Sequence, residues 1–249
     1  MKLSILTASP RSKNPYKFDA TNKNDDEVQE DVGVVIKDLC RFSPGGVLVF
    51  FCSFSYMNAC IKVWEERGIL KVMEEYKDIY KDLQDSQKNK EVLKTFTENN
   101  LKNEKGGIFF SVLRGSASEG IDFSDDIARL VIVIGIPYPP LGEPRVILKK
   151  EYLNEMMNIK TINYVKKLNS GDWYTQCATR AVNQAIGRVI RHRSDYGSMV
   201  LIDSRYAELN KKGLFSKWLN PSIRIYNNDT KIFNDLKMFF DCVKGKITF

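Results

Sequence analysis

Short, almost entirely apolar runs recur along the chain and constrain its fold more than any other feature. Strands buried on both faces of a parallel sheet have this character, whereas a strand with one wet face alternates apolar and polar side chains. The runs predict strands at residues 2–7, 47–51, 108–112, 130–134, 199–202 and 223–226. Helical patterns lie between them, at residues 26–42, 55–67, 88–99, 144–157, 173–192 and 230–242. The alternation predicts an α/β fold with a mainly parallel sheet and helices on both faces.

Length and charge narrow the class of protein. The chain has 249 residues and 43% hydrophobic content, which is enough for one sizeable core. We expect a single domain over residues 1–249, with a short strand–helix extension of it from about residue 221. No apolar stretch approaches the roughly 20 residues of a membrane span, so no membrane association is expected. The net charge of +7 favours anionic partners without naming one.

The cysteines and the histidine argue against a metal centre. Five cysteines form no C-x-x-C pair, and their odd number argues against a disulfide framework. They are Cys40, Cys52, Cys60, Cys177 and Cys242. With His192 as the only histidine, we predict no metal site in this chain.

The run N-Q-A-I-G-R-V-I-R-H-R at residues 183–193 carries three long polar side chains on one stripe of the predicted helix. At about 100° per residue, Gln184, Arg188 and Arg191 fall within roughly 60° of one another, opposite the apolar residues. Gly187 lies beside this stripe, although glycine costs a helix interior roughly 1 kcal/mol relative to alanine. The stripe suits an anion, because a guanidinium fork can bond two phosphate oxygens. The alternative is an ordinary solvated basic face.

A second motif, at residues 109–125, has the form of a buried strand followed by a turn-rich loop. Arg114, Glu119 and Asp122 cluster just past the strand, where open α/β sheets place their ligands. Gly120 permits close approach of a ligand to the backbone. The loop is not a Walker A sequence, because no Lys-Ser or Lys-Thr follows Gly120.

A third segment, at residues 45–58, has the same strand-then-loop form. Ser53 or Ser55 can cap the helix that follows the strand, and Tyr56 lies at the beginning of that helix. This arrangement is common in α/β proteins, and by itself it would identify nothing.

Taken in order, the three segments resemble motifs IV, V and VI in the second motor domain of the Rad3-like helicases of superfamily 2. Motif V appears as R-G-x-x-x-E-G-x-D-F and motif VI as Q-x-x-G-R-x-x-R. Within this group the likeness is greatest to the telomere-elongation helicases. It is carried by the P-Y-P-P turn at 137–140, the helix at 181–193 and the tail at 218–226.

The resemblance implies a RecA-like fold that helps to bind ATP and Mg²⁺ at an interface with a first motor domain. The residues implied to act on the nucleotide are Arg191, Arg188 and Gln184 as the catalytic set, with Gly120, Asp122, Glu119 and Gly187 as ATP contacts. Those implied to contact single-stranded DNA are Ser53, Tyr56, Arg114 and Ser118. The family further implies 5′ to 3′ unwinding and a nuclear role in genome maintenance.

Parts expected of a complete helicase motor are missing from this sequence. There is no G-x-x-x-x-G-K-[ST] loop, and the acidic run at residues 25–27 is not followed by the Ala-His of a D-E-A-H box. The phosphate cradle, the Mg²⁺ site and the family's iron–sulfur cluster are therefore expected in the first motor domain. We expect the chain to be inactive in isolation and to have no iron–sulfur cluster.

Two other classes of protein compete with this interpretation. A non-catalytic RecA-like module that binds nucleic acid or a protein would also lack the phosphate loop, but it would have no need for the arginine pair. A dinucleotide-dependent enzyme is disfavoured, because no G-x-G-x-x-G follows a predicted strand.

Overall fold

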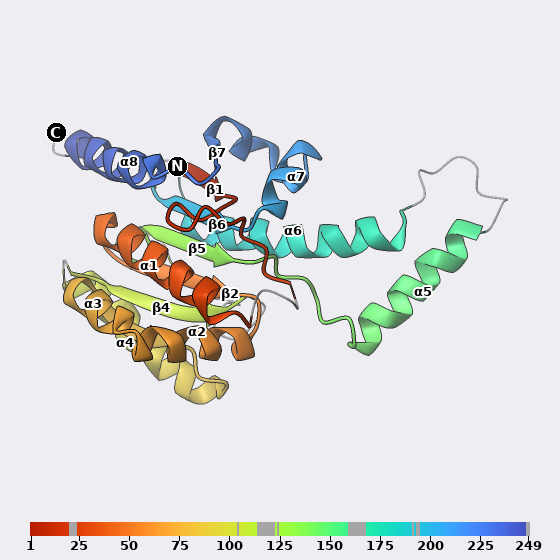
Figure 1. Cartoon of the computed structure of the whole chain (residues 1–249), viewed down its shortest axis with the longest axis horizontal. Coiled ribbons are helices and arrows are strands. Elements are labelled where there is room, and N and C mark those ends of the chain that lie inside the picture. The colour runs from red at the N-terminus through yellow and green to blue at the C-terminus, as the bar shows by residue number, and fades with distance from the viewer. Residues whose placement is uncertain are drawn as a thin grey trace.

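Seven parallel strands form one sheet in the order β3-β4-β2-β5-β6-β1-β7 (Figure 1). The computed structural model describes residues 1–19, 24–103, 105–113, 123, 125–158, 168–190, 192 and 195–247. The strands are β1 (Lys2–Leu6), β2 (Val47–Phe51), β3 (Asp78–Lys81), β4 (Gly107–Val112), β5 (Leu130–Ile134), β6 (Ser198–Ile202) and β7 (Ile223–Tyr226). Every residue of β2, β4, β5 and β6 is buried, as the continuous apolar runs predict. The predicted α/β class with a mainly parallel sheet is confirmed.

Helices cover both faces of the sheet. They are α1 (Asp26–Phe42), α2 (Phe54–Glu66), α3 (Ile69–Tyr76), α4 (Ser86–Lys102), α5 (Pro144–Asn158), α6 (Ser170–Val189), α7 (Arg205–Lys211) and α8 (Lys231–Ile247), with 3-10 turns η1 (Asp125–Ile127) and η2 (Lys217–Ser222). Apolar residues of α1, α2, α3 and α8 form one core cluster, and those of α4, α6 and α7 form a second. The sheet separates the two clusters, because successive side chains of a strand point to opposite faces. In β2, for example, Val49 joins the first cluster and Leu48 the second.

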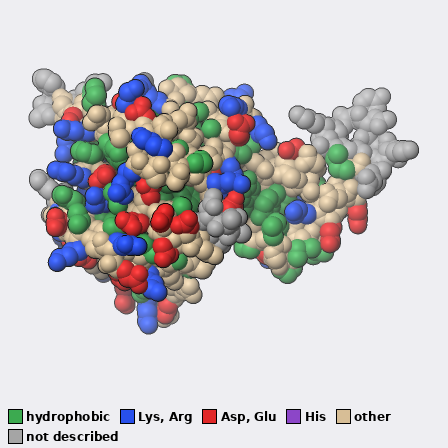
Figure 2. Space-filling model, in the orientation of Figure 1, with side chains coloured by type: hydrophobic (Ala, Val, Ile, Leu, Met, Phe, Trp, Pro, Cys, Tyr) green, Lys and Arg blue, Asp and Glu red, His purple; other side chains and the backbone are tan. Residues whose placement is uncertain are grey.

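Helix α5 and the outer part of α6 form an arm that projects from the body of the molecule (Figure 1). Val146 and Leu153 of α5 are buried, whereas Leu148 and Tyr152 are 65% and 51% exposed. Hydrophobic side chains are accordingly visible on the arm in the space-filling view (Figure 2). No helix in the described part of the chain is long and apolar enough to cross a membrane.

Several predicted elements begin and end where the sequence places them. Three observed elements, β3, α3 and α7, were not predicted. Helix α1 begins at Asp26, where the Asp25 carboxylate accepts hydrogen bonds from the first turn, as the acidic run suggested. Strand β3 lies where the sequence analysis placed no strand. Its D-I-Y-K sequence is only partly buried because β3 is an edge strand held by pairing with β4. The short helices α3 and α7 were also missed.

The predicted end of the motif VI helix is wrong. Helix α6 ends at Val189, and Ile190 is extended, with φ −112° and ψ 103°. Ile190 packs against the second core cluster, and α6 ends three residues before the predicted end at His192. Arg191 itself lies outside the described residues.

The last segment continues the same sheet. Strand β7 pairs in parallel with β1, which pairs in turn with β6. Ile232, Leu236 and Phe240 of α8 are buried in the first core cluster. The strand and helix expected after about residue 221 thus pack onto the body of the chain.

We predict that Gly33→Ala will destabilise the protein, although alanine is the better helix former. A Cβ at Gly33, within α1, would overlap the indole ring of Trp64, whose Nε1 donates to the Gln29 carbonyl at 2.7 Å. Overpacking of this kind costs about 1–3 kcal/mol, which outweighs a propensity gain of about 1 kcal/mol. Urea unfolding followed by circular dichroism measures the difference.

Gly187→Ala in α6 is the matched control, because no described atom outside the neighbouring helix backbone lies within 4 Å of the Cβ that it would add. This variant should be as stable as the wild type or more stable by up to about 1 kcal/mol. If Gly33→Ala were equally stable, the close packing of Trp64 on α1 would be contradicted.

Candidate functional site

Motif IV places Ser53 between the carboxyl end of β2 and the first turn of α2. Ser53 is the N-cap of α2, and its Oγ accepts a hydrogen bond from the Tyr56 backbone N at 3.3 Å. The Ser53 and Ser55 hydroxyls lie 3.1 Å apart. Ser53 is partly exposed and Ser55 is exposed, so capping leaves hydroxyl surface at this edge of the sheet.

Tyr56 is a predicted DNA contact whose side chain the structure places in the core and not at the surface. Its side chain is only 2% exposed and packs against Phe18 and Phe51, because α2 turns this position toward the sheet. Within the described part of the chain, the hydroxyl has no oxygen or nitrogen partner. Burial, and then the neighbouring Cys60, raise the pKa of the phenol well above its usual value. Tyr56 is a core residue that fixes the start of α2.

Motif V is anchored at both ends of its loop. Leu113 follows β4, is buried, and donates its backbone N–H to the Phe51 carbonyl at 3.1 Å. Phe123 is 1% exposed and belongs to the second core cluster. The predicted site residues of this loop lie outside the described residues: Arg114, Ser118, Glu119, Gly120 and Asp122.

Motif VI has the two-sided helix that its spacing indicates. Ala185 and Ile186 are buried against the sheet, whereas Gln184 is exposed. Gly187 is partly exposed, and among the described residues beyond its own helical turn no atom lies within 4 Å of the place where its Cβ would be. Arg188 belongs to α6. The exposed face of this helix therefore carries the amide side chain of Gln184, and the missing side chain of Gly187 leaves open space on the same helix.

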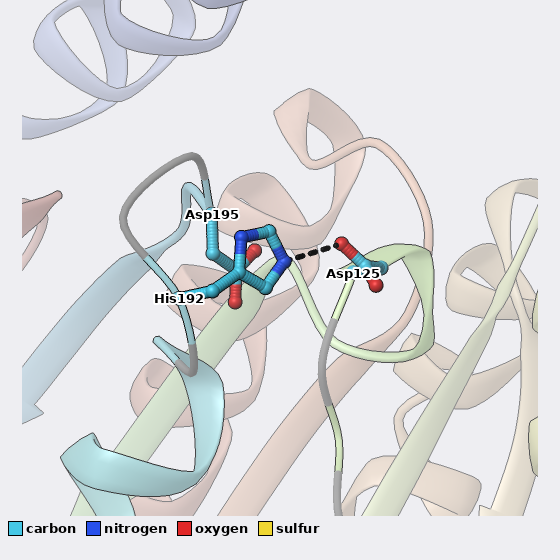
Figure 3. Close-up of side chains that lie close together, drawn as sticks. All are labelled: Asp125, His192 and Asp195. Atoms are coloured by element: carbon cyan, nitrogen blue, oxygen red, sulfur yellow. Dashed lines mark hydrogen bonds and ion pairs between the residues drawn. The ribbon is translucent and has the colours of Figure 1, made fainter.

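The chain segments that follow motifs V and VI meet at the amino edge of the sheet (Figure 3). The His192 ring Nε2 lies 3.3 Å from Oδ1 of Asp125, the first residue of η1. The Arg129 guanidinium donates to Asp126 Oδ1 at 2.9 Å and to Asp195 Oδ1 at 2.8 Å. The geometry therefore brings together residues from either side of β5 that sequence analysis did not connect.

Asp125, His192 and Asp195 are close enough to share a cation (Figure 3), but the contacts favour an ion-pair cluster. Arg129 Nη1 already holds Asp195, and Nη2 lies 3.9 Å from Asp125. A metal ion would therefore meet a fixed positive charge beside two of its three ligands. The absence of a metal site stays a prediction.

A second ion pair at the carboxyl end of β6 also escaped sequence analysis. Asp203 has no exposed surface, and Arg205 donates to both of its oxygens, at 2.8 and 2.7 Å. These hydrogen bonds raise the pKa of Arg205 above its usual value. Tyr206 next to it is buried and donates to the Gly135 carbonyl at 2.8 Å.

Comparison with known proteins identifies the domain. Residues 36–222 match the family described as helicase C-terminal domain. The chain is 38% identical over 216 residues to regulator of telomere elongation helicase 1 of Rattus norvegicus, which covers 86% of this chain and 17% of the rat protein. It is 35% identical over 236 residues to the Arabidopsis thaliana homolog, covering 90% of this chain and 23% of that protein. The chain thus spans about a fifth of these relatives.

The fold resembles a solved XPD helicase. The superposition has a TM-score of 0.58 at 20% identity and covers 90% of this chain and 35% of the other. At that identity the likeness concerns the fold alone. It agrees with the RecA-like architecture expected from the order of the motifs.

We predict that Tyr56→Phe will leave both stability and single-strand binding nearly unchanged. Removing a buried hydroxyl that has no oxygen or nitrogen partner should alter the unfolding free energy by less than about 1 kcal/mol. Tyr56→Ala, in contrast, should cost about 3–5 kcal/mol by opening a cavity. Urea unfolding and the fluorescence anisotropy of a labelled oligonucleotide measure the two effects. A folded Tyr56→Phe protein with weakened DNA binding would mean that the phenol reaches the strand.

Proposed function

This chain belongs to the helicase C-terminal domain family, and we propose that it is the second motor domain of an ATP-dependent DNA helicase. In this proposal ATP and Mg²⁺ are held mainly by a first motor domain, which is the principal partner of this chain. Arg191 and Arg188 approach the γ-phosphate from this side, and Gln184 helps to orient it or the attacking water. The remaining ATP contacts in this proposal are Gly120, Asp122, Glu119 and Gly187.

The observation that carries this proposal is the meeting of the segments after motifs V and VI. His192, next to Arg191 in the chain, contacts Asp125, just beyond Asp122. Exposed Gln184 and the gap at Gly187 lie on the same helix as Arg188. A phosphate group needs converging donors and room for close approach, and this arrangement favours both. ATP supplies the charge that would draw the two motor domains together.

For DNA, we propose that single strands lie along the carboxyl edge of the sheet, over the loops of motifs IV and V. The exposed hydroxyl surface at Ser53 supports a backbone contact, with Arg114 and Ser118 as further contacts. Basic and acidic side chains are interspersed on the face shown in Figure 2. Contacts of this polar kind position a strand without reading its sequence.

The cellular role is proposed from the relatives. Because they are named as regulators of telomere elongation, we propose a nuclear role in genome maintenance for this protein as well. The alternative is a non-catalytic RecA-like module that binds nucleic acid or protein. The two differ in whether the arginines of motif VI are needed for hydrolysis.

The test uses a protein that joins this chain to its first motor domain. Arg191→Ala should lower DNA-stimulated ATP hydrolysis by at least about 10³-fold, as loss of a phosphate-binding arginine finger does in GTPases. Arg191→Lys should recover little, since a point charge cannot reproduce the fork. Turnover is measured by phosphate release at saturating oligonucleotide.

Arg67→Ala is the matched control. Its side chain is 58% exposed at the end of α2, where it forms a surface ion pair with Glu30. It should retain wild-type turnover. If Arg191→Ala also hydrolysed ATP at the wild-type rate, the helicase proposal would fail and the non-catalytic module would take its place.

Single-strand binding by the chain itself should be weak and should fall steeply as salt rises. Each neutralised phosphate contributes about 0.7 to the slope of log affinity against log salt for a single strand. Anisotropy titrations with two oligonucleotides of equal length and different sequence, at several salt concentrations, measure this. A salt-independent affinity, or a large difference between the two oligonucleotides, would count against backbone recognition.

A further inference from the structure

Arg129 holds the chain that leaves motif V against the chain that leaves motif VI. It directly precedes β5, and its side chain is 6% exposed. Its Nε bonds Asp126 in η1, and its Nη1 bonds both the carboxylate of Asp195 and the carbonyl of Tyr196, each at 2.8 Å. The guanidinium carbon lies 3.9 Å from the centre of the Tyr196 ring. One side chain thus contacts both segments.

The backbone of Arg129 is fixed as firmly as its side chain. Its N–H donates to the Gly46 carbonyl at 2.8 Å, and its carbonyl accepts from Ser198 at 2.9 Å. Asp126 also accepts from the Gly46 N–H at 2.9 Å through its backbone carbonyl. The entries to β2, β5 and β6 therefore meet at this residue.

The partner carboxylate is equally constrained. The Asp195 side chain has no exposed surface, and its Oδ1 also accepts from the Tyr196 N–H at 2.9 Å. The Asp195 N–H donates to the His192 carbonyl at 3.0 Å. The His192 ring then reaches back to Asp125. A displacement of either segment must therefore strain the other.

Resting on the proposed function, we propose that Arg129 is a positioning residue that couples the DNA-contacting loop of motif V to the nucleotide-contacting end of motif VI. Arg129 touches neither ligand. It sets the distance between the two segments, so that strand binding at one changes hydrolysis at the other. Arginine is required because its fork reaches acceptors in several directions at once, which an ammonium group on a flexible stem cannot do.

The first experiment tests the contact between the two segments by NMR and does not depend on helicase activity. His192 is the only histidine of the chain, so a ¹H–¹³C spectrum of the ring protons contains one histidine Hε1 signal. Arg129→Lys should shift or split this signal. The matched control is Arg205→Lys, which disturbs the bidentate pair of Arg205 with Asp203 at the opposite edge of the sheet and should leave the signal in place. An unmoved signal in Arg129→Lys would contradict the proposal that Arg129 holds the two segments together.

The second arm measures coupling in the protein that carries both motor domains. In Arg129→Lys, the ratio of DNA-stimulated to basal ATP hydrolysis should fall at least tenfold, while single-strand affinity and basal hydrolysis stay within about threefold of the wild type. Asp195→Asn keeps the shape and the acceptor oxygen and should lower the same ratio by a smaller factor. Asp195→Asn also tests the coupling role if Arg129→Lys fails to fold.

The outcomes separate the two proposals. An active wild type whose stimulation ratio is unchanged in both variants would overturn the coupling role of Arg129 and leave the proposed function intact. A wild-type two-domain protein without DNA-stimulated hydrolysis would overturn the proposed function, and the coupling role with it. A shifted His192 signal with an unchanged ratio would reduce Arg129 to a structural contact.

Discussion

Burial of both faces of the parallel sheet is the constraint on which the rest of the structure depends. In β5, Ile132 faces one core cluster while Val131 and Val133 face the other. When one face is wet, the alternation of apolar and polar side chains fixes the register of a strand, but here both faces are apolar. Polar contacts at the strand entries must therefore supply the register, and the hydrogen bonds that Arg129 makes with Gly46 and Ser198 are contacts of this kind.

The sequence predicted the buried part of the fold well, for a physical reason. A run such as Val47–Phe51 contains only side chains that an interior accepts, and its ends are the ends of the observed strand. Strand β3 gave no such signal, because an edge strand with half-exposed side chains depends on backbone pairing more than on composition. The end of α6 was also missed, since Val189 and Ile190 continue a helical pattern while tertiary packing of Ile190 ends the helix.

The candidate site was predictable only where its determinants are local. Ser53 caps α2 through a contact three residues along the chain, which is the kind of interaction a sequence displays. Tyr56 was misassigned because its position in the first turn of a helix says nothing about which face the sheet covers. The contact of Arg129 with Asp195 joins two loops that are distant in the chain, and no spacing rule in a single sequence indicates it.

Stabilisation of the fold does not by itself explain the buried ion pair between Arg129 and Asp195. Moving the Arg129 guanidinium and the Asp195 carboxylate out of water costs several kcal/mol per ion, and apolar replacements of similar volume are often as stable or more so. What apolar side chains cannot provide is direction, because dispersion contacts tolerate sliding and a forked hydrogen-bond donor does not. The pair therefore makes most sense as a geometric constraint between two loops whose relative position matters, and those loops follow the motifs proposed to bind DNA and nucleotide.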